Sequence, residues 1–341
     1  MILRGNTVTY AMTPMIERSD AETDPRHGRA PHSRPLDELL RTGLVVLDKP
    51  KGPTSHEVVA WLKQIVHLDK AGHSGTLDPN VTGVLPVALL SGTKVVKQLL
   101  DMGKEYVCLM RLHKEADPEA VRQALSLFTG RIFQRPPVKS AVKRQVRVRE
   151  IYAIEILDME GPFVLFRVSC EAGTYIRKLV YDLGMVLGCG ANMVELRRTR
   201  VAGITEAEAC TLQDLSDAYS TWKECGNEAP LRSVVRPMED AISHLRAVWV
   251  RDSAIDALCH GAPLAMPGVV RAQGGIERGN KVAILSLKGE LVALAKAEMD
   301  SKSLKTLDTG IVAVPSRVVM EPGTYPRSWK SSTNHTEDRK N

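Results

Sequence analysis

An aspartate in a glycine-rich loop is the side chain of this sequence best suited to chemistry. Asp78 stands next to last in the segment Gly-His-Ser-Gly-Thr-Leu-Asp-Pro over residues 72–79, which holds too much glycine for a regular helix or strand. Pro79 disfavours helical backbone angles at the residue before it, so we expect the carboxylate of Asp78 on an extended segment. Such a carboxylate can act as a nucleophile or as a proton acceptor. Taken alone, however, an Asp-Pro pair in a loop is more often a turn former.

An arginine at the start of a predicted helix is the second candidate. Residues 174–188 have the clearest helical period in the chain, with apolar residues along one face and Gly188 to end the helix. Arg177 lies off that face, in the first turn, where the positive end of the helix dipole disfavours a cation. This position indicates an anion near its guanidinium, although a surface arginine there costs little.

A stretch of basic residues without acids provides a surface for a polyanion. The net charge of +6 and the pI near 9.0 favour an anionic partner only mildly. Residues 120–149 nevertheless contain no Asp or Glu and eight bases, which are Arg122, Arg131, Arg135, Lys139, Lys143, Arg144, Arg147 and Arg149. Residues 146–149 alternate valine with arginine, as in a strand with one apolar and one arginine face. A solvated surface normally interleaves acids, so we predict that this stretch contacts RNA.

The surrounding patterns predict an α+β protein. A buried strand at residues 44–47 leads into a Pro- and Gly-rich loop, and Ser55 can cap the helix that follows. Residues 106–112 read as a strand, on which Tyr106 alone is most simply a core residue. A helix opened by Asp117 and Pro118 comes next, and strands then dominate up to residue 170.

The length of 341 residues and a change of pattern near residue 247 indicate two domains. Residues 1–42 mix charges with prolines and have no sustained period, so we expect an extended arm or a disordered leader. Residues 43–246 form the larger domain. Residues 247–323 have short strands and one capped helix, as in a compact mixed β domain whose charges nearly cancel. Residues 324–341 are polar and expected to be a loose tail.

Composition excludes several classes of protein. With 43% apolar and 25% charged residues, the chain has the balance of a globular protein. No apolar run approaches the roughly 20 residues of a membrane span, and no secretion signal is visible, so we expect a cytoplasmic protein without membrane contact. The six cysteines include no C-x-x-C pair, and no metal-ligand spacing occurs. We therefore expect no metal.

Several motifs, in order along residues 43–325, resemble those of the TruB/dyskerin family of pseudouridine synthases. They are Leu-Asp-Lys-Pro at 47–50, Gly-Pro-Thr-Ser-His at 52–56, the aspartate loop at 72–79, Gly-Val-Leu-Pro at 83–86, Lys-Glu-Tyr at 104–106, Gly-Thr-Tyr-Ile-Arg at 173–177 and Glu-Leu-Arg-Arg-Thr-Arg at 195–200. The aspartate loop together with the Gly-Thr-Tyr-Ile-Arg helix start is quite specific. Ser74 departs slightly from the family, in which glycine or threonine is common there.

The resemblance implies a fold, an activity and a set of site residues. The fold is α+β, a mixed, mainly antiparallel catalytic sheet with a small β-barrel-like PUA domain that binds RNA. Asp78 is then the catalytic carboxylate, Arg177 its partner and Tyr106 the ring that stacks on the target base. His73 helps to extrude the nucleotide. Tyr175 and Lys49 support the site, and Leu196 lines the pocket.

The chemistry of the residues agrees with these roles. A stacked uridine must be flipped out of the RNA, which calls for a stacking ring and a wedge, and Tyr106 and His73 are suitable types. Cleaving the N-glycosidic bond needs an ionised carboxylate near the sugar, which a neighbouring arginine favours. The base then re-bonds through carbon, so no redox cofactor, nucleotide or metal is required. The residues leave covalent attack and proton abstraction at the sugar as open alternatives.

Further resemblances point to the archaeal dyskerin-type branch of the family. They are the proline-rich arm, the sequence Lys-Glu-Tyr-Val-Cys-Leu-Met at 104–110, and Gln-Arg-Pro-Pro at 134–137 with Ser-Ala-Val-Lys-Arg at 140–144. Such proteins resemble the catalytic subunit of box H/ACA ribonucleoproteins, which implies a guide RNA, small H/ACA core proteins and an rRNA substrate. They are also linked to uridine 55 of tRNA, so a stand-alone tRNA synthase is the first alternative.

A non-catalytic RNA-binding scaffold is the rival from another class. A pure binding module has no reason to assemble Asp78, Tyr106 and Arg177 from three separate segments. A glycosidase would need a second carboxylate at a defined separation, and no phosphate-binding G-x-x-x-x-G-K-[ST] loop occurs.

Overall fold

The computed structural model describes residues 14–136 and 145–327. Contacts divide the described residues into two compact units. One comprises residues 36–241 and the other joins residues 14–35 to residues 242–327. The N-terminal stretch is therefore shared between the units, which the residue pattern did not predict.

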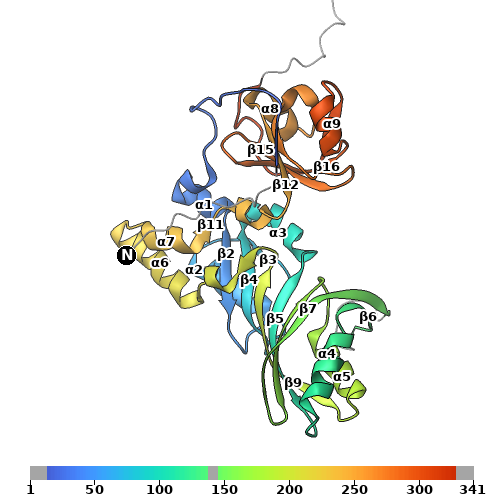
Figure 1. The fold of residues 1–341 in the computed structure, drawn as a ribbon. Helices are drawn as coiled ribbons and strands as arrows, with labels where there is room; N and C mark the ends of the chain where they lie inside the picture. The colour runs from blue at the N-terminus through green and yellow to red at the C-terminus, as the bar shows by residue number, and fades with distance from the viewer. Residues whose placement is uncertain (1–13, 137–144, 328–341) are drawn as a thin grey trace, which may run out of the picture. The chain divides into compact units, whose positions relative to one another are not determined.

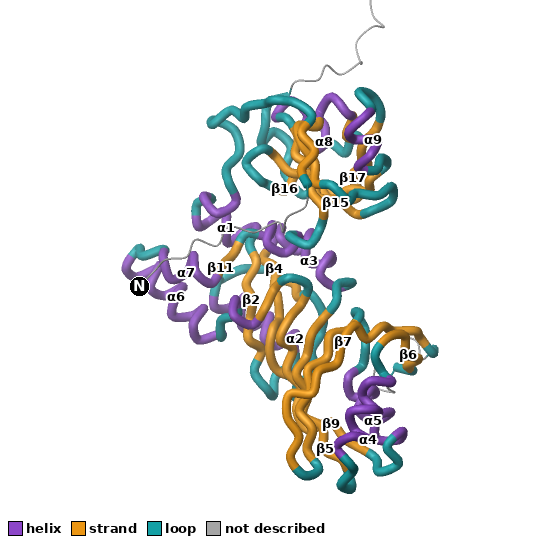
Figure 2. Tube along the Cα trace, in the orientation of Figure 1, coloured by secondary structure: helices purple, strands orange, loops and turns teal. Residues whose placement is uncertain are grey.

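The unit of residues 36–241 is built on one twisted sheet (Figures 1 and 2). Among the described residues its strands run in the order β11-β2-β4-β9-β5-β8-β7-β6, with β3 on β4 and β10 on β9. They are β2 (Leu44–Lys49), β3 (Ala71–His73), β4 (Thr82–Leu89), β5 (Lys104–Leu112), β6 (Gly130–Gln134), β7 (Arg147–Glu160), β8 (Phe163–Cys170), β9 (Ala191–Val201), β10 (Ile204–Thr205) and β11 (Val235–Arg236). All described pairs are antiparallel except β4 with β9. The predicted mixed, mainly antiparallel sheet is confirmed.

Helices cover this sheet over two separate apolar clusters. They are α1 (Leu36–Thr42), α2 (Ser55–Ile65), α3 (Thr93–Leu100), α4 (Pro118–Leu127), α5 (Ile176–Val186), α6 (Leu212–Cys225) and α7 (Ala229–Val234). Val58 and Leu62 of α2 pack with Leu47 of β2 in one cluster. Leu179 of α5 packs with Phe166 of β8 in the other. The two clusters fix the elements that carry the predicted site residues.

Two predicted helix starts differ from the structure. The helix expected from residue 174 begins at Ile176 and ends at Val186, because Tyr175 has extended backbone angles and serves as its N-cap. Gly173, at φ +77°, makes the turn before it. Thr54 caps α2 in a reciprocal capping box with Glu57, so the prediction that Ser55 caps this helix is wrong.

The second unit is a smaller sheet with two helices. Its strand order is β1-β14-β12-β15-β16-β17-β13, and β12 with β15 is the parallel pair among its described strands. The elements are β1 (Met15–Glu17), β12 (Arg246–Val250), α8 (Asp252–Cys259), β13 (Leu264–Ala265), β14 (Val269–Gln273), β15 (Lys281–Ser286), β16 (Leu291–Ala297), α9 (Ser301–Thr306) and β17 (Ile311–Val318). The predicted compact mixed β region is confirmed in kind.

Residues 14–35 are built into this second unit. Ile16 of β1 is 4% exposed and pairs with Ala272 of β14. Further on, the backbone N–H of Arg29 donates to Glu290. Glu290 also accepts from Tyr325, which is 1% exposed, so ordered chain continues past residue 323, where the sequence suggested a loose tail.

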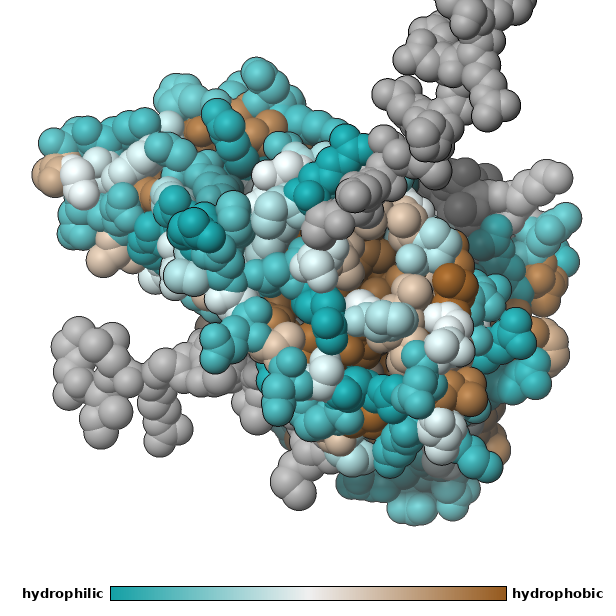
Figure 3. All heavy atoms as spheres, turned by 90° about the horizontal axis from the view of Figure 1, so that it is seen from above, coloured by the Kyte–Doolittle hydropathy of each residue, from teal (hydrophilic) through white to brown (hydrophobic). Residues whose placement is uncertain are grey.

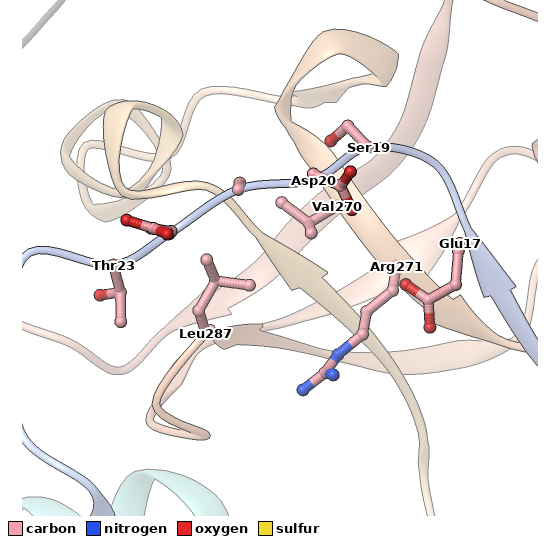
Figure 4. A pocket seen from close by; sticks show the side chains of 9 residues that line it. Glu17, Ser19, Asp20, Thr23, Val270, Arg271 and Leu287 are labelled. Carbon is pink, nitrogen blue, oxygen red and sulfur yellow. The ribbon is translucent and has the colours of Figure 1, made fainter.

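A cavity of about 540 Å³ opens in the second unit, where the N-terminal segment crosses β14 (Figure 4). Glu17 and Arg271 lie side by side there, as the β1–β14 register requires. The guanidinium of Arg271 also lies over the ring of Trp249, 4.8 Å from its centroid. The cavity therefore comes from the packing of the N-terminal segment on the sheet.

The visible surface is largely hydrophilic. In the face drawn in Figure 3, polar side chains surround smaller hydrophobic groups. Within the described residues, none of the helices has the length and apolar character needed to cross a bilayer.

Candidate active site

Asp78 and Arg177, 99 residues apart in sequence, meet in an exposed ion pair. Arg177 Nη2 donates to Asp78 Oδ2 at 2.6 Å, and the two side chains are 58% and 57% exposed. Asp78 belongs to the loop between β3 and β4, and Arg177 to the first turn of α5. The anion indicated by an arginine at a helix start is therefore this carboxylate. Their exposure leaves the pair open to a large substrate.

Two buried polar side chains hold the Asp78 loop from either side. Before Asp78, the hydroxyl of Ser55 accepts from the N–H of Leu77 at 2.9 Å and donates to its carbonyl at 3.1 Å. After it, Lys49 Nζ donates to the carbonyls of Pro79 at 3.1 Å and Val81 at 2.9 Å. Burial lowers the pKa of Lys49, and the Asp78 carboxylate opposes that shift. The carboxylate thus extends from a backbone fixed on both sides.

Tyr106 lies on β5 beside a buried arginine. Arg198 of β9 is 1% exposed and donates from Nε to the carbonyl of Val84 at 2.8 Å and from Nη2 to that of Gly75 at 3.3 Å. Its positive charge also acts on the phenol of Tyr106. Burial raises the pKa of Tyr106, and Asp78 adds to the rise against the opposing charge of Arg198. The ring is therefore a neutral, oriented surface near the carboxylate.

Gly83 allows the close approach of β4 and β9 beneath this group. Its φ is +103°, and an added Cβ would lie 2.2 Å from the carbonyl oxygen of Arg198. No L-residue with a side chain fits there without moving the β9 backbone. The glycine is thus required where the parallel pair meets the Asp78 loop.

His73 ends β3 at the edge of the same group. Its Nδ1 accepts from the N–H of Gly75 at 3.3 Å, and its ring makes an edge contact with His56, centroid to centroid 5.1 Å. Burial lowers the pKa of His73, and the charges of His56 and Arg198 lower it further. His56 was left out of the predicted site, but the structure places it against His73.

Leu196 and Tyr175 belong to the elements that surround the Asp78–Arg177 pair. Leu196 is 9% exposed, in the apolar cluster against which Tyr106 packs. Tyr175 is the N-cap of α5, two residues before Arg177, and its backbone N–H and carbonyl both bind the side chain of Gln134.

The four basic residues assigned to RNA binding lie partly inside and partly outside the described residues. Lys143 and Arg144 lie outside the described residues. Arg147 and Arg149 are on β7, which confirms the predicted strand, but Val146 is 54% exposed, so the strand start has no buried apolar face. The Arg149 side chain is 19% exposed and pairs with Glu171 at 3.3 Å. Glu171, an acid from outside residues 120–149, therefore pairs with one of the basic residues of the predicted RNA surface.

Sequence reasoning did not predict the contacts that three residues make around the site, namely Ser55, Gln134 and Arg198. A usable signal existed for Arg198, because residues two apart on a strand point to one side of the sheet, which groups it with Leu196. The contacts of Ser55 and Gln134 join segments 22 and 41 residues apart and leave no local pattern. Within residues 14–136 and 145–327, no group of three or more His, Cys, Asp or Glu side chains could hold a metal ion.

Ser55→Ala is expected to lower the free energy of unfolding by about 1–3 kcal/mol, because the buried N–H and carbonyl of Leu77 lose their partner. The loop that carries Asp78 then loses a fixed point, so turnover should fall further than stability explains. Thr54→Ala is the matched control, since it removes only the helix cap, at about 1 kcal/mol. Urea denaturation and single-turnover rates of both variants test this. Equal rates in the two would contradict it.

Family models match nearly the whole chain. The model described as TruB family pseudouridylate synthase (N terminal domain) matches residues 63–176, and that of the tRNA pseudouridylate synthase B C-terminal domain matches residues 177–243. A PUA domain model matches residues 246–319, and the DKCLD (NUC011) domain matches residues 10–59. The first two join at Ile176 and Arg177, in the first turn of α5.

Curated relatives and solved structures agree with these models. The probable tRNA pseudouridine synthase B of Methanopyrus kandleri is 55% identical over 94% of this chain and 94% of its own. That of Archaeoglobus fulgidus is 53% identical over 93% and 97%. A chain in an H/ACA RNP bound to a substrate RNA containing 2'-deoxyuridine is 48% identical, with a TM-score of 0.88 over 94% of this chain and 98% of that one.

A chain in a crystal structure of a Cbf5-Nop10-Gar1 complex is 50% identical, again with a TM-score of 0.88, over 93% of this chain and 97% of that one. Sequence identity at this level over nearly the whole chain shows that the proteins share a family as well as a fold. The chain therefore belongs to the TruB family of pseudouridylate synthases, which are isomerases.

Proposed function

We propose that this enzyme converts uridine to pseudouridine in RNA with Asp78 as its catalytic carboxylate, Arg177 as the partner of that carboxylate and Tyr106 as the stacking ring. The observation that carries the proposal is the 2.6 Å contact between Arg177 and Asp78 on an exposed surface. The ion pair contains one carboxylate, whereas a glycosidase would need two at a defined separation.

In the reaction, the bond from C1' to N1 breaks, a bond from C1' to C5 forms, N1 gains a proton and C5 loses one, so the atoms balance without a co-reactant. Asp78 acts on the sugar as a nucleophile or as the acceptor of a proton. Arg177 orients the carboxylate by a charge-assisted hydrogen bond. Tyr106 stacks on the extruded base, His73 helps to extrude it, and Leu196 lines the pocket. Lys49 and Tyr175 hold the backbone on which Asp78 and Arg177 sit.

The proposed substrates and partners follow from the relatives. The curated relatives are named for tRNA, and the matched chains belong to assemblies with H/ACA RNA, Nop10 and Gar1. We therefore propose that this chain is the catalytic subunit of a guide ribonucleoprotein acting on rRNA, that it modifies uridine 55 of tRNA, or that it does both. Cytoplasm is the proposed location.

The proposed division of labour assigns residues 43–246 to catalysis and residues 247–323 to PUA-type RNA binding, with an arm at residues 1–42 and a tail at residues 324–341. The compact units divide at residues 35 and 241, close to the limits of the larger domain. Within the proposed arm of residues 1–42, residues 14–35 pack on the unit proposed to bind RNA.

Mapping of pseudouridine in two reactions tests the proposed function. The purified chain is incubated with a tRNA transcript, and separately with guide RNA, the small core proteins and an rRNA fragment. Product only in the second reaction assigns the guide-dependent function, and product in the first assigns the stand-alone tRNA synthase. Product in neither would favour the second candidate, a non-catalytic RNA-binding scaffold.

Arg147→Gln is expected to weaken RNA binding and to lower the slope of log affinity against log salt by about 0.7–0.9, the value for one lost phosphate contact. Lys143 and Arg144 are proposed to act in the same way. Arg149→Gln should lower the slope less, because Glu171 already holds its guanidinium. Salt titrations of binding test this, with Lys223→Gln on α6 as the control. A slope unchanged by Arg147→Gln would contradict the proposed RNA surface.

A further inference from the structure

Gln134, the last residue of β6, has a buried carboxamide that binds both polar backbone groups of one residue. Its Oε1 accepts from the N–H of Tyr175 at 2.9 Å, and its Nε2 donates to the carbonyl of Tyr175 at 3.1 Å. The residue is 2% exposed. The side chain of Tyr175 makes no cap hydrogen bond, so a side chain from another element fixes this helix start.

The carbonyl held by Gln134 is also the one on which the first turn of α5 closes. The N–H groups of Lys178 and Leu179 donate to it at 3.1 and 3.0 Å. Arg177 lies within that turn, and its exposed side chain reaches Asp78. The backbone position of Arg177 therefore depends on a contact made from β6.

A second contact, made from the neighbouring strand β7, supports the turn before α5. Arg149 of β7 pairs with Glu171, and its guanidinium nitrogens lie 3.2 and 3.4 Å from where a Cβ of Gly173 would be. β6 and β7 are paired, with Gln134 opposite Arg147. In Figures 1 and 2, β6 lies at the same end of the sheet as α4 and α5. The hairpin thus holds both the turn and the helix start.

We propose that Gln134 is a positioning residue for the isomerisation: its carboxamide fixes the start of α5 so that Arg177 meets Asp78 in the reactive arrangement. The proposal rests on the proposed roles of Asp78 and Arg177. Gln134 acts on the pair through the backbone of Tyr175, to which it is bonded. Because reaction rates fall steeply with displacements of about 1 Å, a loosened helix start costs turnover before it costs folding.

Two variants test the proposal, Gln134→Met, which keeps the length and removes both hydrogen bonds, and Gln134→Glu, which keeps the acceptor and removes the donor. We expect the single-turnover rate at saturating RNA to fall about tenfold in each, with RNA affinity within about twofold of wild type. Amide hydrogen exchange of the peptide covering residues 173–180 should accelerate, while that of α4 should not.

A double variant shows whether Gln134 acts through Arg177. In an Arg177→Met background, adding Gln134→Met should lower the residual rate less than about twofold, since contributions through one group are not additive. Val121→Ala in α4 is the control for lost stability alone. It truncates a side chain in the apolar cluster that also contains the buried face of α5. It should leave exchange at residues 173–180 unchanged.

Three results would overturn the proposal: unchanged exchange at residues 173–180, a rate loss that Val121→Ala reproduces at equal stability, or a further tenfold loss in the double variant. If Gln134→Met fails to fold, Gln134→Glu and its exchange pattern decide. Activity in Asp78→Asn would instead contradict the proposed function, and the exchange result would still report on the helix start.

Discussion

Asp78→Asn is expected to lower the rate of pseudouridine formation by about a thousandfold or more. The amide has the size of the carboxylate, but it has no charge with which to attack the sugar or accept its proton. Arg177 can still donate to the amide oxygen, so the pair should keep its geometry. The measurement is a single-turnover assay that follows release of tritium from C5 of labelled uridine, because the reaction replaces that hydrogen.

RNA affinity of Asp78→Asn should stay within a few-fold of wild type, because one exposed side chain changes. Asp69→Asn, an exposed aspartate of the same unit, is the control for loss of a negative charge from the surface, and it should keep full activity. A rate above a tenth of wild type in Asp78→Asn would contradict the proposed mechanism.

Arg177→Met is expected to lower turnover by about 10²- to 10³-fold with a change in stability within about 0.5 kcal/mol. The side chain is 58% exposed and lies off the apolar face of α5, so its removal costs little packing. Exposed ion pairs contribute at most about 1 kcal/mol. The carboxylate, however, loses the group that orients it.

Lys178→Met is the matched control for Arg177→Met. Lys178 is the next residue, pairs with Asp182 and lies over the ring of Tyr181 at 4.6 Å, so its loss should leave the rate within about threefold of wild type. Thermal unfolding and single-turnover rates of the two variants decide. Unfolding of Arg177→Met at low temperature would instead indicate a structural role.

Local patterns predicted several of the large elements, although they missed the 14-residue helix α6 and the 11-residue strand β9. The helical period of residues 176–187 and the apolar strands at residues 44–47 and 106–112 arise from burial against a sheet, which leaves a mark in nearby residues. The short elements left no such mark. α1 has seven residues, and β1 has three whose pattern depends on β14 more than 250 positions away. Their formation depends on partners that the local sequence does not contain.

The same distinction applies to the candidate site, where residues in motifs were predictable and their supporting contacts were not. Asp78, Tyr106 and Arg177 could be named because each stands in a motif that resembles the family. The contacts that hold them could not, since the hydroxyl of Ser55 and the carboxamide of Gln134 bind backbone groups, which every residue type except proline offers alike. The partner of Arg149 was also hidden, because Glu171 approaches it only after β7 and β8 have paired.

The pairing of β1 with β14 affects how the chain is made. At a synthesis rate of about 5–20 residues per second, residues 15–17 wait roughly 13–50 s on the ribosome before residues 269–273 emerge. Meanwhile Ile16 has no cover, but Glu17, Arg18, Asp20 and Glu22 follow it closely and keep the nascent segment hydrated. Residues 36–241 can complete their sheet within that interval, so the second unit closes last, on a segment made long before its partner strand.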